Sequence, residues 1–230
     1  MTVRRLILLR HGQTDYNRGS RMQGQLDTDL SELGHAQAAA AASVLGEHQP
    51  LVIVSSDLRR AHHTAVKLGE QSGQEIHLDS RLRETHLGQW QGLTHHDVDA
   101  TVPGARLAWR EDPTWAPPGG ESRIDVADRS LPVVAELVAE ETRWGRDPDP
   151  DRPVVLVAHG GLIAALCAAL LKLPVATWPI LGGMGNGSWV QLSGHSDETG
   201  ESQSVPVGLD SIRWRLDVWN ASAQVAGDVL

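Results

Sequence analysis

The sequence predicts an α/β fold: a three-layer sandwich with a mostly parallel central sheet. Three short, unbroken apolar runs, at residues 6–9, 51–54 and 154–158, have the pattern of strands that are buried on both faces. Segments with apolar residues at spacings of three and four separate these runs, which is the period of helices. Strands that alternate with helices indicate a sheet with largely parallel strands and helices on both faces.

The first half of the chain is expected to form two strand–helix units. A polar, glycine-containing loop follows the first strand to about Leu30, and Ser31 is placed as the N-cap of a helix that extends through Val44. The second strand is followed by a helix with Ala61, Ala65 and Leu68 on one side.

The middle of the chain is less regular. Residues 84–120 are rich in Gly, Pro, His and Trp, and we expect loops and short helices that lie over the sheet. A long helical pattern from Ile124 to Val138 follows, with Pro132 inside it. An interior proline costs a helix about 3 kcal/mol, so either the helix kinks there or a new helix begins near Ser130.

The region after the third buried strand is expected to contribute strands at one edge of the sheet. Residues 212–219 alternate strictly between apolar and polar, as a half-buried strand does, and residues 187–193 are candidates to pair with them. The linker at 195–208 is rich in Ser, Glu and Gly and is predicted to be flexible. We expect a single domain over 1–230, with a helical and loop sub-region at about 84–145 that covers the active site.

Composition narrows the classes of function. The net charge of -9 argues against a nucleic-acid binder, which needs a basic face. No apolar run approaches the roughly 20 residues that span a bilayer, and the N-terminus has no long apolar run of a signal peptide. The single cysteine, Cys167, excludes an internal disulfide and lies in an apolar stretch, where a buried structural thiol is expected. A cytoplasmic protein without a membrane partner is therefore expected.

Polar clusters follow all three predicted buried strands. They are Arg10-His11-Gly12, Ser55-Ser56-Asp57 leading to Arg60, and His159-Gly160-Gly161. In open α/β sheets ligands bind beyond the carboxyl ends of the strands, so these clusters should meet. Two guanidinium groups make a strong clamp for a phosphate dianion. The glycines let backbone N–H groups approach a ligand, and Gly160 and Gly161 open a helix whose N-terminus favours negative charge.

A metal site is the main alternative for these histidines. His11, His159 and carboxylates such as Asp15, Asp57 and Glu84 have the chemistry of zinc ligands. The arginines of the same clusters would then face a divalent cation at short range, which argues against metal. The pairs His62-His63 and His95-His96 are adjacent in predicted helices and so do not share a face.

Five motifs resemble the histidine phosphatase superfamily, the phosphoglycerate mutase-like enzymes. They are Leu9-Arg10-His11-Gly12-Gln13-Thr14 with Asn17, the segment from Ser56 to Ala65, the segment from Leu82 to Gly92 with Gln91 in place of the usual Glu, Gly119-Gly120-Glu121-Ser122, and Val157-Ala158-His159-Gly160-Gly161. They occur in the order of the family and extend from Leu6 to about Leu171. The resemblance implies the histidine phosphatase fold.

The resemblance also implies a role for each matching residue. His11 would be the nucleophile, Arg10, Arg60 and His159 the phosphate pocket, and Glu84 the proton donor. A neutral imidazole is nucleophilic and can form a covalent intermediate, which agrees with this assignment. Further substrate contacts are expected from Asn17, Gln23 and Gly160. No cofactor and no metal are implied.

Within the superfamily the resemblance favours hydrolysis over mutase chemistry. The segment from Arg10 to Asp27 resembles the phosphatase branch, and the glycine-rich middle gives no sign of the larger lid with which mutases exclude water. Segments 20–34, 81–92, 182–186 and 217–224 resemble a member that acts on a small phosphorylated sugar acid. A broad-specificity or cobalamin-pathway phosphatase, a mutase and a non-catalytic phosphate-binding scaffold are the alternatives. A homodimer is also implied.

Two residues near the predicted site each allow two interpretations. Glu121 either contacts the edge of the pocket or caps the following helix. His86 either lines the site beside Glu84 or belongs to the loop alone.

Overall fold

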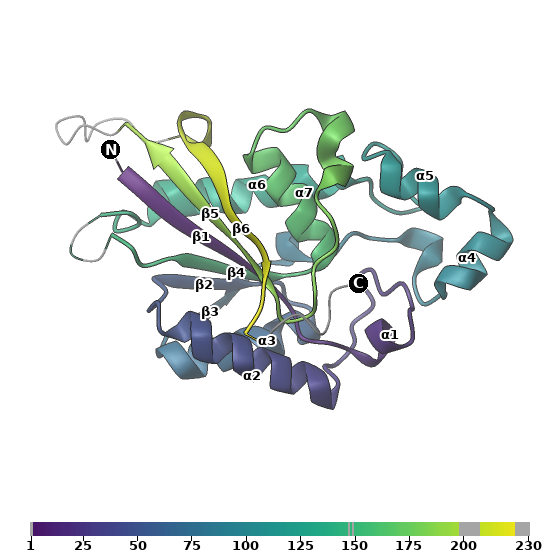
Figure 1. Ribbon diagram of the computed structural model, residues 1–230, viewed down its shortest axis with the longest axis horizontal. Coiled ribbons are helices and arrows are strands. Elements are labelled where there is room, and N and C mark those ends of the chain that lie inside the picture. Colours follow the sequence, from purple (N-terminus) through teal and green to yellow (C-terminus); the bar gives the residue numbers. More distant parts are fainter. Residues whose placement is uncertain (1, 147, 149, 198–207, 224–230) are drawn as a thin grey trace.

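The computed structural model describes residues 2–146, 148, 150–197 and 208–223. Its centre is a six-stranded sheet in the order β3-β2-β4-β1-β5-β6 (Figure 1). The strands are β1 (Thr2–Arg10), β2 (Val52–Ser55), β3 (Ile76–Leu78), β4 (Val154–Ala158), β5 (Trp189–Ser196) and β6 (Arg213–Ala221). Four neighbouring strands, β3, β2, β4 and β1, are parallel, whereas β5 is antiparallel to both β1 and β6. The expected α/β fold with a mostly parallel sheet is confirmed.

The two faces of the sheet carry different helices, which confirms the three layers. Helices α2 (Glu32–Gly46) and α3 (Arg59–Ser72) supply the core on one face, and α6 (Arg123–Glu140) and α7 (Gly160–Leu170) on the other. Alternate side chains of β1 point to opposite faces, so Leu8 packs with α6 and α7 whereas Leu9 packs with α2 and α3. Both are fully buried, as the unbroken apolar run predicts.

The predicted pairing at the C-terminal edge is also confirmed. β6 alternates between exposed and partly buried side chains through Val218, and β5 pairs with it. β5 extends to Ser196, so His195 and Ser196, the first residues of the predicted linker, belong to a strand. Their backbone also pairs with β1. Residues 198–207 of that linker lie outside the described residues. β3 was not predicted, since three residues are too few to show a period.

One helix, α6, passes through Pro132. It begins at Ser122, whose side chain accepts from Asp125 N while the Asp125 carboxylate accepts from Ser122 N, a capping box. Ser130 therefore starts no new helix, and its hydroxyl donates to Val126 O at 2.8 Å. Buried side chains on both sides of the proline, Val126 and Val138 among them, pack on the sheet. Their burial outweighs the local cost of the proline.

The middle of the chain forms short helices at a different place from the one expected. These are η2 (Gly88–Trp90), α4 (His95–Thr101) and α5 (Ala105–Glu111). They lie beyond the carboxyl ends of the parallel strands and not over a sheet face (Figure 1), because helices already cover both faces. Their side chains Trp90, Val98 and Ala105 form a separate apolar cluster with Met22 and Leu87 from neighbouring loops. The expectation of helices over the sheet is therefore wrong, while that of loops and short helices is confirmed.

The remaining short elements connect these layers. They are α1 (Asp15–Arg18), η1 (Ser80–Leu82), η3 (Val175–Ile180) and η4 (Leu209–Ser211). Within the described residues, no helix combines the length and apolar character needed to cross a membrane. The organisation as a single domain stays a prediction.

The loop after β1 packs against the start of α2 through two glycines. A Cβ on Gly12 would lie 2.1 Å from Gly34 O, and a Cβ on Gly34 would lie 2.0 Å from Gln13 O. Ser31 completes the contact as the predicted N-cap, since its side chain accepts from Gly34 N at 3.1 Å. Only glycine allows the backbone that follows His11 to approach the helix so closely.

Gly34→Ala should lower the free energy of unfolding by about 1–3 kcal/mol, because the added methyl group overpacks a backbone contact. Urea denaturation measures the change. Gly182→Ala is the matched control, since a Cβ there meets no atom within 4 Å, and it should leave the midpoint almost unchanged. Equal midpoints for the two variants would contradict the proposed packing.

Candidate active site

His11 stands at the end of β1 with its ring orientation fixed. Its backbone N–H donates to Ala158 O at 3.0 Å, and its ring Nδ1 lies 2.7 Å from Gly12 O. A carbonyl oxygen only accepts, so Nδ1 carries the proton of the neutral ring. Nε2 therefore keeps its lone pair. The side chain is buried, 3% exposed.

His159 follows β4 and faces His11 across the sheet edge. The two ring centroids are 5.1 Å apart. His159 Nε2 lies 2.9 Å from Ser56 Oγ, which already accepts from Leu58 N at 3.3 Å. The described residues offer the Ser56 hydroxyl no other acceptor, so it can donate to Nε2, and the ring proton of His159 is then on Nδ1. Nδ1 is buried and has no hydrogen-bond partner in the described part of the chain.

Arg10 and Arg60 are brought to the same place. Arg60 is 1% exposed and donates from Nη1 to Leu26 O and from Nη2 to Gly24 O, both at 2.7 Å. Arg10 donates from Nη1 to Met184 O. The Nε atoms of both side chains are buried and have no hydrogen-bond partner among the residues that the structure describes. Two cations with spare donors thus face the histidines.

Burial and charge make both histidines neutral. Desolvation, followed by the positive charge of Arg60, holds the pKa of His11 and that of His159 well below the ordinary value of 6.5. Burial also lowers the pKa of Arg60 to about 10, which leaves it charged at neutral pH. The pocket therefore combines two neutral imidazoles with two guanidinium ions.

Glu84 places its carboxylate at the N-terminus of α7. Oε2 accepts from Gly161 N at 3.0 Å, and Oε1 accepts from Leu162 N at 3.0 Å and from Thr85 N at 2.8 Å. The negative charge acts on both Arg10 and Arg60, whose pKa values it raises against the effect of burial. A Cβ on Gly161 would come within 2.6 Å of Oε1. Gly161 therefore makes room for Glu84.

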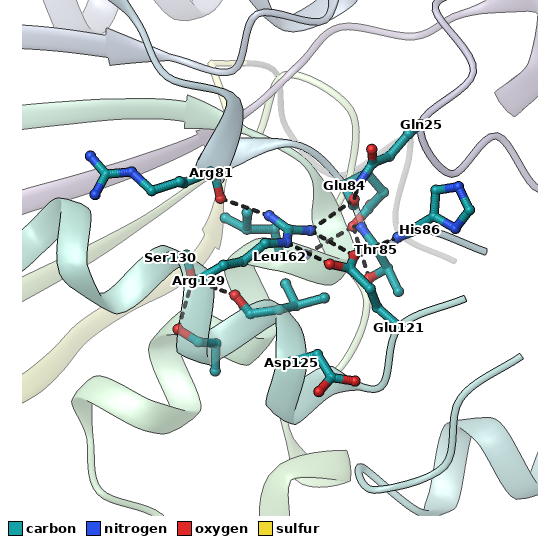
Figure 2. A network of polar contacts seen from close by, with 12 residues as sticks. Gln25, Arg81, Glu84, Thr85, His86, Glu121, Asp125, Arg129, Ser130 and Leu162 are labelled. Carbon is teal, nitrogen blue, oxygen red and sulfur yellow. Dashed lines mark hydrogen bonds and ion pairs between the residues drawn. The ribbon is translucent and has the colours of Figure 1, made fainter. Parts of the chain in front are cut away.

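The backbone that carries Glu84 is held from α6 (Figure 2). Arg129 donates to Glu84 O at 2.9 Å and pairs with Glu121, whose Oε2 also accepts from His86 N at 2.8 Å. Glu121 thus does not cap α6, whose N-cap is Ser122, and its carboxylate instead holds the backbone at His86. His86 accepts at Nδ1 from Gly88 N at 3.2 Å, as part of its own loop.

The side-chain oxygens of the predicted site residues Asn17 and Gln23 both accept hydrogen bonds within the protein. Asn17 Oδ1 accepts from Thr14 N at 3.1 Å and from Asn186 Nδ2 at 3.2 Å. Gln23 is buried, and its Oε1 accepts from the hydroxyl groups of Thr14 and Thr28 at 3.0 and 2.6 Å. Neither amide nitrogen has a hydrogen-bond partner among the residues that the structure describes, so each can donate to a further acceptor.

One sequence-based expectation about the glycines is wrong. The N–H of Gly12 does not serve a ligand, because it donates to Thr64 Oγ1 at 3.1 Å, and Gly161 N is bound to Glu84. Gly160 is the first residue of α7, where a helix leaves backbone N–H groups without intrahelical partners. The glycines serve close packing as much as ligand approach.

Sequence reasoning missed two supporting residues. Arg129 lies inside a helix pattern and follows no strand, so nothing in the pattern distinguished it. Asn186 donates from Nδ2 to His11 O and to Asn17 Oδ1, both at 3.2 Å. Among the described residues, no group of three or more His, Cys, Asp or Glu side chains is placed to hold a metal ion.

Comparison with known proteins identifies the family. The model of the histidine phosphatase superfamily (branch 1) matches residues 6–203. The chain belongs to this superfamily, which confirms the resemblance found in the sequence. Full-length relatives of the chain are named as phosphatases, and they share its family. The chain is therefore a phosphoric monoester hydrolase.

Similar proteins cover the whole chain. Glucosyl-3-phosphoglycerate phosphatase of Mycobacterium tuberculosis (strain ATCC 25618 / H37Rv) is 72% identical over 230 residues, 100% of both chains. The native structure of mycobacterial glucosyl-3-phosphoglycerate phosphatase is 72% identical, with a TM-score of 0.89 over 96% of this chain and 100% of that one. The structure of that enzyme with inorganic phosphate has a TM-score of 0.88 and 71% identity over 97% and 100%.

The neutral histidines make stability depend on pH. Below pH 6.5 the unfolded chain binds protons at His11 and the folded chain does not, so stability falls as the pH decreases. Between pH 6.5 and 5.5 this single group should account for a loss of about 1 kcal/mol. Urea denaturation at both pH values should therefore show a shallower loss in His11→Asn than in the unmodified chain. Equal losses would mean that His11 is protonated in the fold.

Proposed function

We propose that the chain hydrolyses a phosphate monoester through a phosphohistidine at His11. One observation carries this proposal: three buried nitrogen atoms around His11, namely Arg10 Nε, Arg60 Nε and His159 Nδ1, have no hydrogen-bond partner in the described part of the chain. Buried polar groups are normally paired, so their coincidence at one place indicates a ligand that accepts hydrogen bonds. A phosphate dianion accepts from all three and offsets the two positive charges.

In the first step, Nε2 of His11 attacks the phosphorus while the bond from phosphorus to the ester oxygen breaks. Arg10, Arg60 and His159 stabilise the charge on the transferring phosphoryl oxygens, with further donors from Asn17, Gln23 and Gly160. Nδ1–H remains bound to Gly12 O and stabilises the ring as it becomes positive. Glu84 takes up a proton when the negatively charged ester binds beside it, gives this proton to the leaving oxygen, and the alcohol departs.

In the second step, water replaces the alcohol. The Glu84 carboxylate takes a proton from the water while its oxygen attacks the phosphorus, and the bond from phosphorus to Nε2 breaks. Phosphate leaves, His11 regains its lone pair and Glu84 regains its proton. Every catalytic group in this cycle is a residue of the chain, so we propose that hydrolysis needs no added metal.

The substrate is glucosyl-3-phosphoglycerate, which is converted to glucosylglycerate and phosphate. Support comes from the relatives named for this activity, which are 70–72% identical over the full length of the chain. The sequence resemblance further predicts a role in methylglucose lipopolysaccharide synthesis. A cytoplasmic location, a homodimer and the lack of nucleic-acid partners also stay predictions.

A panel of phosphate monoesters tests the substrate and the catalyst together. We expect the highest kcat/KM with glucosyl-3-phosphoglycerate, with phosphoserine, 3-phosphoglycerate and α-ribazole phosphate as competitors in the panel. His11→Ala should lower the rate by at least about a thousandfold, because the covalent route is lost. The rate of the unmodified chain should persist in a metal chelator.

The outcomes separate the alternatives. Equal rates on all esters would replace the assigned substrate with a broad-specificity phosphatase. Isomerised phosphoglycerate in place of free phosphate would indicate a mutase, and substrate binding without turnover would indicate a scaffold. Full activity of His11→Ala would overturn the mechanism.

A further inference from the structure

Arg129 reaches from α6 to the segment that carries Glu84 (Figure 2). Its Nη1 donates to Arg81 O at 2.7 Å, and its Nη2 donates to Glu84 O at 2.9 Å. The same guanidinium binds Glu121 through both carboxylate oxygens, with Nε–Oε1 at 2.9 Å and Nη2–Oε2 at 3.0 Å. Because a guanidinium is planar and its donors point in fixed directions, these four bonds define one position for the segment.

Glu121 holds the far end of the same segment. Its Oε2 accepts from His86 N, and its own N–H donates to His86 O, both at 2.8 Å. Burial opposes ionisation of the Glu121 carboxyl, but the bonds from Arg129 and from His86 N outweigh it and hold its pKa below the ordinary value. The side chains of Arg129 and Glu121 are only 20% and 23% exposed, so solvent weakens this ion pair little.

Glu84 is therefore fixed at two ends. The amides of α7 and Thr85 hold its carboxylate, and Arg129 holds its backbone carbonyl together with Gln25, whose Nε2 donates at 3.1 Å. The hydrogen bonds of Arg129 reach the main chain of Glu84 and not its carboxylate. A displacement of about 1 Å in a reacting group can cost about 100-fold in rate.

Arg129 is not needed to attach α6 to the sheet. The apolar face of α6, with Val126, Val134 and Val138 among its buried side chains, does so. We propose that Arg129, oriented by Glu121, is a positioning residue that places the Glu84 carboxylate for proton transfer to the leaving oxygen. This inference rests on the proposed function, in which Glu84 is the acid.

A positioning role predicts a dependence on the leaving group. A sugar-acid ester expels a basic alkoxide, which needs a proton as the bond breaks. p-Nitrophenyl phosphate expels a stabilised phenolate, which needs almost none. A defect confined to Glu84 therefore slows the first ester and spares the second, whereas damage to the phosphate pocket or to the fold slows both.

The test compares Arg129→Lys and Glu121→Gln with the unmodified chain in single-turnover formation of the phosphoenzyme. With glucosyl-3-phosphoglycerate we expect Arg129→Lys to lose about 100-fold in rate, and with p-nitrophenyl phosphate we expect almost no loss. Glu121→Gln keeps an oxygen that can accept from Arg129, and it should show the same selectivity with a smaller loss. Affinity for inorganic vanadate should be unchanged in both variants.

Glu136→Gln is the matched control. It removes an ion pair in which Glu136 of α6 binds Arg81, the first residue of the same segment, at 2.6 Å, yet it touches no bond of Glu84. It should keep the rates of the unmodified chain with both esters. Equal losses on the two esters in the Arg129 and Glu121 variants, or no loss on either, would overturn the inference. An unmodified chain that forms no phosphoenzyme with either ester would instead overturn the proposed function.

Discussion

The structure depends on the burial of two histidines, of Arg60 and of part of Arg10 at one edge of one sheet. Such a group is costly in a protein interior, because each cation loses water and each repels protons from the imidazoles. The chain offsets part of this cost with carbonyl acceptors at Leu26, Gly24 and Met184 and with the negative charge of Glu84. Within this group, Arg10 Nε, Arg60 Nε and His159 Nδ1 are still left without hydrogen-bond partners among the described residues. A phosphate dianion supplies what they lack.

The scaffold around this group is built from backbone contacts that few side chains would permit. Gly12 and Gly34 join the loop after β1 to α2, and Gly161 admits the Glu84 carboxylate to α7. Arg129 and Glu121 then fix the Glu84 segment to α6. The nucleophile thus follows a strand of the central sheet, whereas the acid lies in a loop that is tied to α6. Rigid contacts at the sheet edge hold the two in register.

The sequence predicts the parts of this arrangement that follow a period or a strand. Apolar runs located β1, β2 and β4, and polar residues directly after them located His11, Arg60 and His159. Whether α6 continues through Pro132 depends on its packing against the sheet, which the sequence does not show. The position of α4 and α5 depends on the other helices, which already cover both faces of the sheet. The partners of Arg129 and Asn186 are distant in sequence, so no local pattern reveals them. Gly12 was expected to serve a ligand, whereas it serves a backbone contact.

Detection of the covalent intermediate tests directly whether phosphate is transferred to His11. Rapid quenching during turnover, followed by mass spectrometry of peptides at alkaline pH, identifies the phosphorylated residue. We expect an acid-labile phosphoryl group on His11, attached at Nε2 because Nδ1 is bound to Gly12 O. A phosphoryl group on another residue, or turnover in which the chain never carries phosphate, would contradict this expectation.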